Sequence, residues 1–476
     1  MNKDIYFLDY IIKKDCSPNK DYHNFFQFLQ NYKNNSELFI NVSILSKNEY
    51  LNYKKEFENK IDNNNLTKLE RACIGSILGM AIGDAMGART EFKPLIYEYN
   101  KVQNMGNSIG GIFKLHPGQW TDDTSMGLCL ADSLIEKKGK FEPKDIMIRF
   151  ILWWFFGYNN SFRFDEKRKN RHSVGLGGNI KESLYSFINS KGANEYTNCG
   201  NENTSGNGTI MRNAAIPICY FSNYKIALRY AKCQSLITHK GYEAAGCCQL
   251  LTFIVIKILN NKKAQLLNTQ SYSGNSRAKD LKEILDDLSD FNCEYKSVNF
   301  LAYSKQEGED KDRNWNWKSE SFKYSETRAK KNPNYIGSYC MDGLAMALHI
   351  LYHTSSFERA ILKAVNLCGD SDSVASVVGQ IAGAYYEMDA IPKDWIKAIN
   401  DWDHNEIALR GYILCHLNKI KIDGSDGEFS EKDNKRVNNE NIKEERPIIQ
   451  EKEMENKKSF NPSINKKRIH DCCYIF

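Results

Sequence analysis

Apolar residues recur every three to four positions along most of the middle of the chain. Three segments keep this spacing over a helical length: SMGLCLADSLIEK (125–137), YEAAGCCQLLTFIVIKIL (242–259) and MDGLAMALHILYH (341–353). No run of alternating β-branched residues bounded by turn residues occurs, which would be typical of a half-buried strand. The pattern therefore predicts an all-α, compact multi-helix fold.

Changes in composition divide the chain into four zones. Residues 1–66, rich in Asn, Lys, Tyr and Phe, are predicted to form a partly helical N-terminal extension. Residues 67–420 carry the helical pattern and are predicted to form the main domain, with a polar and aromatic insertion or lid at about 261–332. Residues 421–476 are charged and Asn-rich, and have too little apolar surface to offset the entropy of ordering, so they are predicted to be a disordered tail.

Composition and charge narrow the class of protein. The 476 residues are 41% hydrophobic and 26% charged, as in soluble proteins, and the net charge of +6 comes from scattered cations, which argues against a nucleic-acid partner. The N-terminus does not resemble a signal peptide, and the longest apolar runs are shorter than the ~20 residues of a membrane helix. The 14 cysteines, without a CxxC pair, are predicted to be reduced thiols. We expect a cytoplasmic protein, and a monomer.

Glycine occupies every fourth position of GSILGMAIGDAMGARTEF, residues 75–92. Residues four apart stack on one helix face, and each interior glycine costs about 1 kcal/mol relative to alanine. Another backbone is therefore expected to approach this face closely. The charged Asp84 argues against a membrane dimer face. Near the end of the stretch stands Glu91, which on this stretch alone is better interpreted as a surface acid.

Carboxylates and hydroxyls gather at two predicted helix starts. Thr121-Asp122-Asp123-Thr124 follows one turn, and Asp370-Ser371-Asp372-Ser373 follows another. One such residue would suffice to cap each helix, but the clustering occurs twice. Four carboxylates brought together would repel one another without cations, and oxygen ligands without His or Cys suit Mg²⁺ or Mn²⁺. Two such ions can orient a substrate and a water molecule.

Two glycine-rich segments precede helical pattern: HSVGLGGN (172–179) and NTSGNGTIMRNAAIP (203–217). Backbone N–H groups of such loops can cradle phosphates, although each segment alone is more typical of an ordinary turn. The first is not a dinucleotide-binding fingerprint, because no strand precedes it. His239, in LITHKGYEAAG, is compatible with a place in the site and equally with a hydrogen-bonded structural role.

Taken together, these segments resemble the ADP-ribosylglycohydrolase family. The resemblance rests on the helix ending in Glu91 and on WTDDTSM, GNGTIMR, THKGYEAAG and CGDSDS, which occur in the family's order over about residues 68–415. It implies an all-α fold around a two-magnesium site. It also implies an enzyme that hydrolyses the glycosidic bond of ADP-ribose attached to proteins or small acceptors.

The resemblance also implies roles for individual residues. Glu91 and Asp123 are the implied catalytic acids, and Ser373 stands where many members have threonine. Gly177 and Gly178, from the first glycine loop, are predicted to contact substrate. The implied metal ligands are Thr121, Asp122, Asp123, Asp370, Asp372 and Ser373, and the other implied substrate contacts are Ser205, Gly206, Asn207, Gly208, Met211 and His239.

Two other functions remain open at this point. A protein of the same fold could bind ADP-ribose without turnover, or be crystallin-like. An all-α, Mg²⁺-dependent prenyl-diphosphate enzyme fits less well, because Met126 stands where the third aspartate of its DDxxD motif would lie.

The C-terminal residues predict lipidation. Cys473-Tyr474-Ile475-Phe476 fits a prenylation box, with a basic run just upstream and Cys472 available for a second lipid. We therefore expect peripheral membrane attachment through Cys473.

Overall fold

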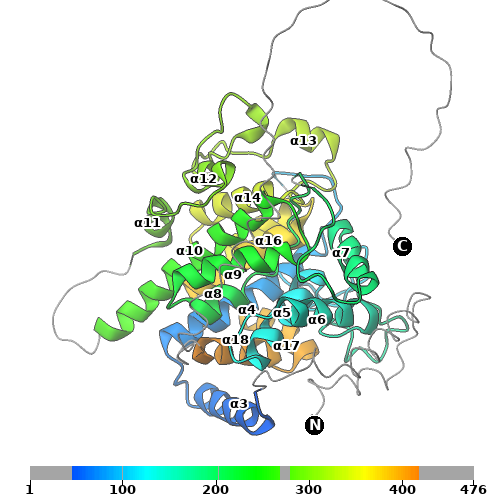
Figure 1. Ribbon diagram of the computed structural model, residues 1–476. Coiled ribbons are helices and arrows are strands. Elements are labelled where there is room, and N and C mark those ends of the chain that lie inside the picture. The colour runs from blue at the N-terminus through cyan, green and yellow to red at the C-terminus, as the bar shows by residue number, and fades with distance from the viewer. Residues whose placement is uncertain (1–44, 99, 202, 269–278, 418–476) are drawn as a thin grey trace, which may run out of the picture. The chain divides into compact units, whose positions relative to one another are not determined.

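The computed structural model describes residues 45–98, 100–201, 203–268 and 279–417 of the chain. Within these ranges the secondary structure is helical, with isolated β-bridges and no strand (Figure 1). The all-α prediction is confirmed. The predicted tail at 421–476, with its prenylation box at Cys473, lies outside the described residues, as does most of the N-terminal extension.

The helices begin where local sequence signals place them. Thr67 and Glu70, for example, form a reciprocal capping box at the start of α4. The first helices are α3 (Lys47–Asp62), α4 (Lys68–Gly87), α5 (Asp122–Glu136), α6 (Pro143–Phe156), α7 (Gly178–Asn189), α8 (Ala215–Tyr220), α9 (Tyr224–Leu236) and α10 (Tyr242–Asn268). The others are α11 (Leu281–Asp286), α12 (Lys296–Ala302), α13 (Glu326–Lys331), α14 (Cys340–Tyr352), α15 (Phe357–Asn366), α16 (Ser371–Tyr386), α17 (Lys393–Asp403) and α18 (Glu406–Leu417), with 3₁₀ turns at Lys311–Arg313 and Met388–Ala390.

Helices α4 and α16 lie side by side at the centre of the helical body (Figure 1). The α4 glycines face α16 in antiparallel order: Gly75 meets Gly383, Gly79 meets Gly379, and Gly83 meets Ala375. A Cβ atom on any of these three α4 glycines would lie closer than 3.0 Å to a backbone atom of α16. The expected close approach of a second backbone is confirmed. It also brings the C-terminal end of α4 to the N-terminal end of α16.

Helix α10 is long and apolar enough to cross a membrane, with a mean hydropathy of 1.5 over its best window. However, 83% of that window is buried inside the protein, against α4, α9, α14 and α16. Its apolar sequence is therefore explained by its position in the core.

The polar and aromatic segment that follows α10 packs into the same core. Trp315 and Trp317 are almost fully buried in the main hydrophobic cluster, and Trp317 Nε1 donates a hydrogen bond of 2.7 Å to the Leu301 carbonyl. This part of the predicted insertion is thus built into the helical body.

Candidate active site

Acidic side chains from three distant parts of the chain converge where α4, α5 and α16 meet. Glu91 follows α4, Asp123 lies in the first turn of α5, and Asp370 and Asp372 lie at the start of α16; all are buried. Carboxylate oxygens of Glu91, Asp370 and Asp372 lie within 4.8 Å of one another. Asp372 also belongs to a second group of the same size with Asp123 and Asp84, so one carboxylate joins two potential cation sites.

Helix capping does not account for the two acid-rich turns. The N-cap residues Thr121 of α5 and Asp370 of α16 make no side-chain capping hydrogen bond. Instead, Asp84 of α4 accepts hydrogen bonds from the Thr121 N–H (2.9 Å), the Thr121 hydroxyl (2.8 Å) and the Thr124 N–H (2.9 Å). Because Asp84 caps α5 from a neighbouring helix, Asp122 and Asp123 are left free to act as ligands.

Removal of the Asp84 carboxylate should loosen the start of α5. In Asp84→Ala, measured with Mg²⁺ present, we expect the amides of Thr121 and Thr124 to exchange hydrogen about 5- to 150-fold faster, because buried donors lose their acceptor at a cost of about 1–3 kcal/mol. Asp84→Asn keeps one acceptor oxygen and should show a smaller increase. Unchanged exchange in both variants would contradict the capping role.

Burial and mutual repulsion raise the pKa of several of the clustered acids. Burial, together with the charges of Asp372 and Asp370, holds the pKa of Glu91 well above its ordinary value. Burial and neighbouring carboxylates raise the pKa of Asp122, Asp123 and Asp372 in the same direction. Among the described residues, Glu91 Oε2 and Asp123 Oδ1 are buried without a hydrogen-bond partner.

These features fit bound cations. An unpaired buried carboxylate is unfavourable, and a divalent ion would compensate several of these at once. The donors are carboxylate and hydroxyl oxygens, which hard cations prefer. The Thr121 hydroxyl, whose proton is directed to Asp84, lies 3.5 Å from Asp372 Oδ2 and keeps a lone pair for a ligand.

The second glycine loop lies directly beside the acids. The Asn207 side-chain amide donates to Asp370 Oδ2 (3.2 Å) and to the Gly337 carbonyl (3.1 Å). The Ser373 hydroxyl contacts Met211 Sδ at 3.7 Å. Ser205 Oγ is buried and has no hydrogen-bond partner among the described residues. The structure therefore places the predicted substrate loop and the predicted metal ligands in contact.

His239 is buried against this loop. A Cβ atom on Gly208 would lie 3.0 Å from the His239 ring, and one on Gly206 would lie 3.3 Å from Nε2. His239 Nδ1 lies 2.9 Å from the Thr238 hydroxyl, which accepts a hydrogen bond from Arg212. Burial and the Arg212 charge lower the pKa of His239 to about 3, so the ring is neutral. The two sequence interpretations of His239 are compatible: it is hydrogen-bonded within the fold and borders the loop.

The first glycine loop reaches the acids through a residue that the sequence prediction missed. Gly175 has a φ of +89°, and a Cβ atom there would collide with Asp122 Oδ1. Gly177 is the N-cap of α7, and a Cβ atom on Gly178 would meet nothing within 4 Å, so Gly178 is not required by packing. Asn179 Nδ2, which follows them, donates to the Thr204 carbonyl (3.3 Å) and joins the two glycine loops.

Two aromatic rings also lie beside the acids. Phe92 and Tyr335 stack with their ring centroids 5.4 Å apart. The charge of Asp370, then burial and the charge of Glu91, raise the pKa of the Tyr335 hydroxyl, which indicates how near these acids are. Sequence offered no signal for Tyr335.

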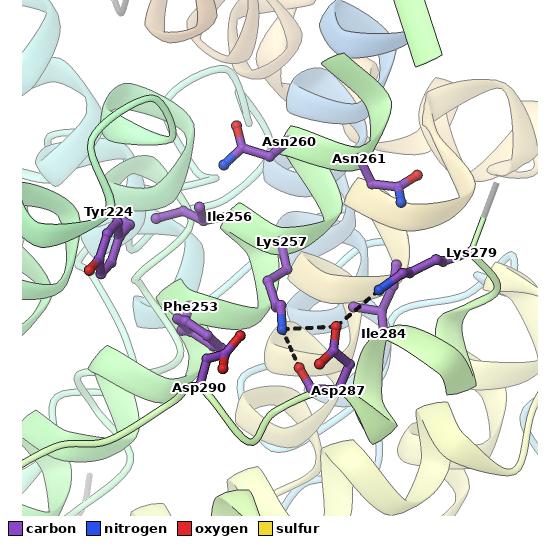
Figure 2. Close-up of a pocket in the computed structure, with 10 residues that line it drawn as sticks. All are labelled: Tyr224, Phe253, Ile256, Lys257, Asn260, Asn261, Lys279, Ile284, Asp287 and Asp290. Atoms are coloured by element: carbon purple, nitrogen blue, oxygen red, sulfur yellow. Dashed lines mark hydrogen bonds and ion pairs between the residues drawn. The ribbon is translucent and has the colours of Figure 1, made fainter. Parts of the chain in front are cut away.

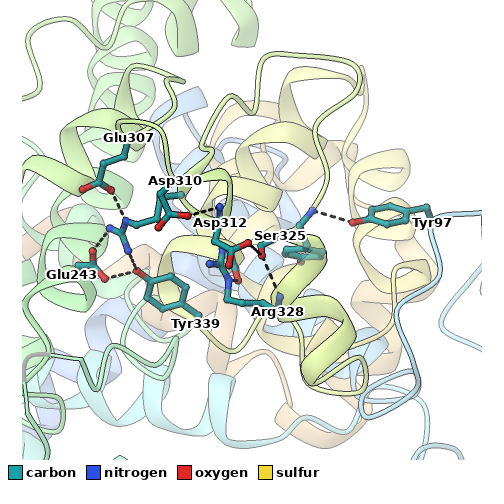
Figure 3. Close-up of polar contacts among 11 residues, drawn as sticks. Tyr97, Glu243, Glu307, Asp310, Asp312, Ser325, Arg328 and Tyr339 are labelled. Carbon is teal, nitrogen blue, oxygen red and sulfur yellow. Dashed lines mark hydrogen bonds and ion pairs between the residues drawn. The ribbon is translucent and has the colours of Figure 1, made fainter. Parts of the chain in front are cut away.

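A network of polar contacts around Arg313 and Tyr339 holds the second glycine loop in place (Figure 3). Arg313 donates to Glu243 at the start of α10, to Glu307 (2.6 Å) and to the Tyr339 hydroxyl (3.0 Å). Tyr339 in turn forms a β-bridge with Gly206. The segment after α12 is thereby fastened to the loop that borders the acids.

A separate pocket lies away from the acid cluster. It has a volume of about 530 Å³ and is lined by residues of α9, α10 and α11 and the turn after α11, including Phe253, Lys257 and Asp287 (Figure 2). None of the clustered acids lines it, and Lys257 and Lys279 both pair with Asp287. Its chemistry is separate from that of the acid cluster.

The fold and the site together define an all-α enzyme with a buried carboxylate centre suited to divalent cations. The family model for ADP-ribosylglycohydrolase matches residues 65–419. The chain belongs to the ADP-ribosylglycohydrolase family, and it is a glycohydrolase.

Individual relatives agree with this assignment. The chain is 31% identical over 322 residues to the ADP-ribosylarginine hydrolase Tri1 of Serratia proteamaculans, covering 68% of this chain and 73% of that protein. It is 23% identical over 330 residues to the ADP-ribosyl-dinitrogen reductase glycohydrolase of Rhodospirillum rubrum, covering 69% and 90%. A solved structure described as an ADP-ribosylglycohydrolase-related protein complex is 27% identical, with a TM-score of 0.51, and covers 74% of this chain and all of that chain.

Proposed function

We propose that this enzyme hydrolyses the bond between C1 of the distal ribose of ADP-ribose and an acceptor on a protein or small molecule, thereby reversing ADP-ribosylation. The convergence of Glu91, Asp123, Asp370 and Asp372 beside the Asn207 loop, with Asp122 close enough to feel the charges of Asp370 and Asp372, carries this proposal. The printed activity of the Serratia relative makes the arginine linkage the first one to test.

We propose two Mg²⁺ ions as the resident cations, with Mn²⁺ as a substitute. Thr121, Asp122, Asp123, Asp370, Asp372 and Ser373 would hold them. Bound ions of this kind neutralise the carboxylates, polarise ribose hydroxyls and lower the pKa of water. The chain itself supplies the loop Ser205–Gly208 for the diphosphate and the ribose.

The reaction adds the oxygen of water to C1, and the bond to the acceptor breaks as the acceptor takes up a proton. Glu91 and Asp123 are the two groups proposed to move that proton, because each has a buried carboxylate oxygen without a hydrogen-bond partner in the described chain. Glu91 is 7% exposed and Asp123 only 1%, so Glu91 is the better placed to touch the sugar.

A panel of ADP-ribosylated arginine, serine and acetyl substrates tests this function. We expect release of free ADP-ribose from at least one of them with Mg²⁺, and none after EDTA treatment, measured by chromatography. Binding of ADP-ribose by calorimetry without release from any substrate would instead indicate a binding protein of the same fold. Release that persists in EDTA would contradict the role of the cations.

A further inference from the structure

A short loop near the acid cluster exposes an unusual density of positive charge. Residues 163–172, here called the basic loop, have the sequence RFDEKRKNRH. Lys167, Lys169 and Arg171 are exposed and form no ion pair with any described residue. Glu166 is the loop's exposed acid. The other acid, Asp165, is buried and accepts hydrogen bonds from the Lys167 and Arg168 N–H groups and from Gln119.

The basic loop is held in place by its own contacts. Arg168 stacks on the Phe162 ring at 3.8 Å and donates to the carbonyls of Phe113 (3.0 Å) and Lys114 (3.1 Å). Asn160 Nδ2 donates to the Arg171 carbonyl (2.9 Å). These contacts fix the backbone that carries Lys167, Lys169 and Arg171.

The loop is continuous with the site in two directions. After His172 the chain continues through Ser173 and Val174 to Gly175, which lies against Asp122. Through Arg168 it also contacts residues 105–115, whose Phe113 ring lies 6.3 Å from that of Phe92. This neighbouring turn adds the exposed Lys114 and the exposed apolar side chains of Ile109 (54%) and Ile112 (53%). The exposed cations and the exposed isoleucines therefore lie on two segments that contact each other, and each segment leads to a residue next to the acid cluster.

We propose that the basic loop and the 105–115 turn form the docking surface for an acidic segment of the ADP-ribosylated protein. The proposal rests on the proposed function, and names the kind of acceptor that this enzyme prefers. Opposite charges favour an acidic partner and suppress a basic one. Ile109 and Ile112 fit a polypeptide better than a nucleic acid, whose backbone offers phosphates and sugars. The proposed function assigns the diphosphate of ADP-ribose to the separate Ser205–Gly208 loop.

Labelled peptides that carry ADP-ribose through a non-hydrolysable linkage provide the test, because their binding does not depend on turnover. With Mg²⁺ at about 50 mM salt, we expect a peptide flanked by four glutamates to bind the full chain at least about tenfold more tightly than one flanked by four serines. The preference should vanish in about 0.5 M salt, where charges are screened. It should also vanish in Lys167→Glu/Lys169→Glu/Arg171→Glu.

A matched control changes the net charge equally at exposed lysines of α3, α9 and α13. Lys55→Glu/Lys225→Glu/Lys331→Glu should keep the glutamate preference. Hydrolysis of a small ADP-ribosyl acceptor without peptide should be equal in both triple variants and the unchanged protein.

Each other result has a definite meaning. Equal loss of preference in both triple variants would overturn the surface. Loss of small-acceptor hydrolysis in the basic-loop variant alone would indicate that the basic side chains of the loop bind the diphosphate of ADP-ribose. That result would also overturn the proposed docking surface. Tighter binding of a DNA oligonucleotide through the same lysines would make it a nucleic-acid surface. A glutamate preference in a protein that hydrolyses no substrate would keep the surface and reject the proposed function.

Discussion

Asp122→Asn combined with Asp370→Asn is expected to lower turnover at least about a thousandfold while the protein remains folded. The two residues lie at the starts of α5 and α16, and each faces the other carboxylates of the cluster. Asparagine keeps the volume and one acceptor oxygen, but removes the negative charge that would hold a cation. Loss of several kcal/mol of transition-state stabilisation corresponds to a rate factor of this size. The measurement is kcat at saturating Mg²⁺ on whichever panel substrate is cleaved.

The pH dependence of thermal stability, measured without metal, provides the control for this double variant. Burial raises the pKa of both Asp122 and Asp370 in the metal-free folded protein, and the charges of Asp372 and Asp84 raise that of Asp122 further. The folded state therefore binds more protons than the unfolded state above pH ~4, so the metal-free protein should lose stability as pH rises from there. The double variant should melt higher than the unchanged protein without metal at pH 7–8, with a flatter pH profile, and Mg²⁺ should raise its Tm less. Retained turnover would remove the two-cation proposal.

The fold could be predicted because its main signals are local. Helical periodicity in α5, α10 and α14 is visible in the residues themselves, and the spacing of the α4 glycines predicts a close backbone neighbour. The identity of that neighbour was not predictable from spacing alone. It required the antiparallel match with Gly379 and Gly383 of α16, more than 290 residues later.

The acidic residues of the site could be predicted from the sequence. The residues that position them were harder to predict. Local capping rules assign the start of α5 to Thr121, whereas the cap is Asp84 on another helix. The one signal for Asp84 was a charged residue inside an otherwise apolar helix. Gly175 stood unmarked among its glycine neighbours, because its positive φ and its contact with Asp122 arise only in the folded chain. Trp315 and Trp317 lie in a segment of polar composition, for which the sequence did not predict burial.

Gly79→Ala is expected to destabilise the protein by at least about 4 kcal/mol, although alanine is the better helix former by about 1 kcal/mol. The added Cβ would lie closer than 3.0 Å to both the carbonyl oxygen and the carbonyl carbon of Gly379, and neither can rotate away. Relief of the collision requires α4 and α16 to separate. Because net stabilities are typically ~5–15 kcal/mol, this loss removes much of the margin. Chemical denaturation, or the soluble yield where the protein no longer folds, measures it.

The same substitution at Gly178 separates steric collision from any general effect of replacing a helical glycine. Gly178 is the first residue of α7, and a Cβ atom there meets nothing within 4 Å. We therefore expect Gly178→Ala to change the free energy of unfolding by no more than about 1 kcal/mol, in the stabilising direction. A Gly79→Ala protein as stable as the Gly178→Ala protein would show that α4 and α16 do not approach as closely as the structure has them. Since that approach sets Glu91 and Asp84 beside Asp372, the geometry of the acid cluster would then be wrong as well.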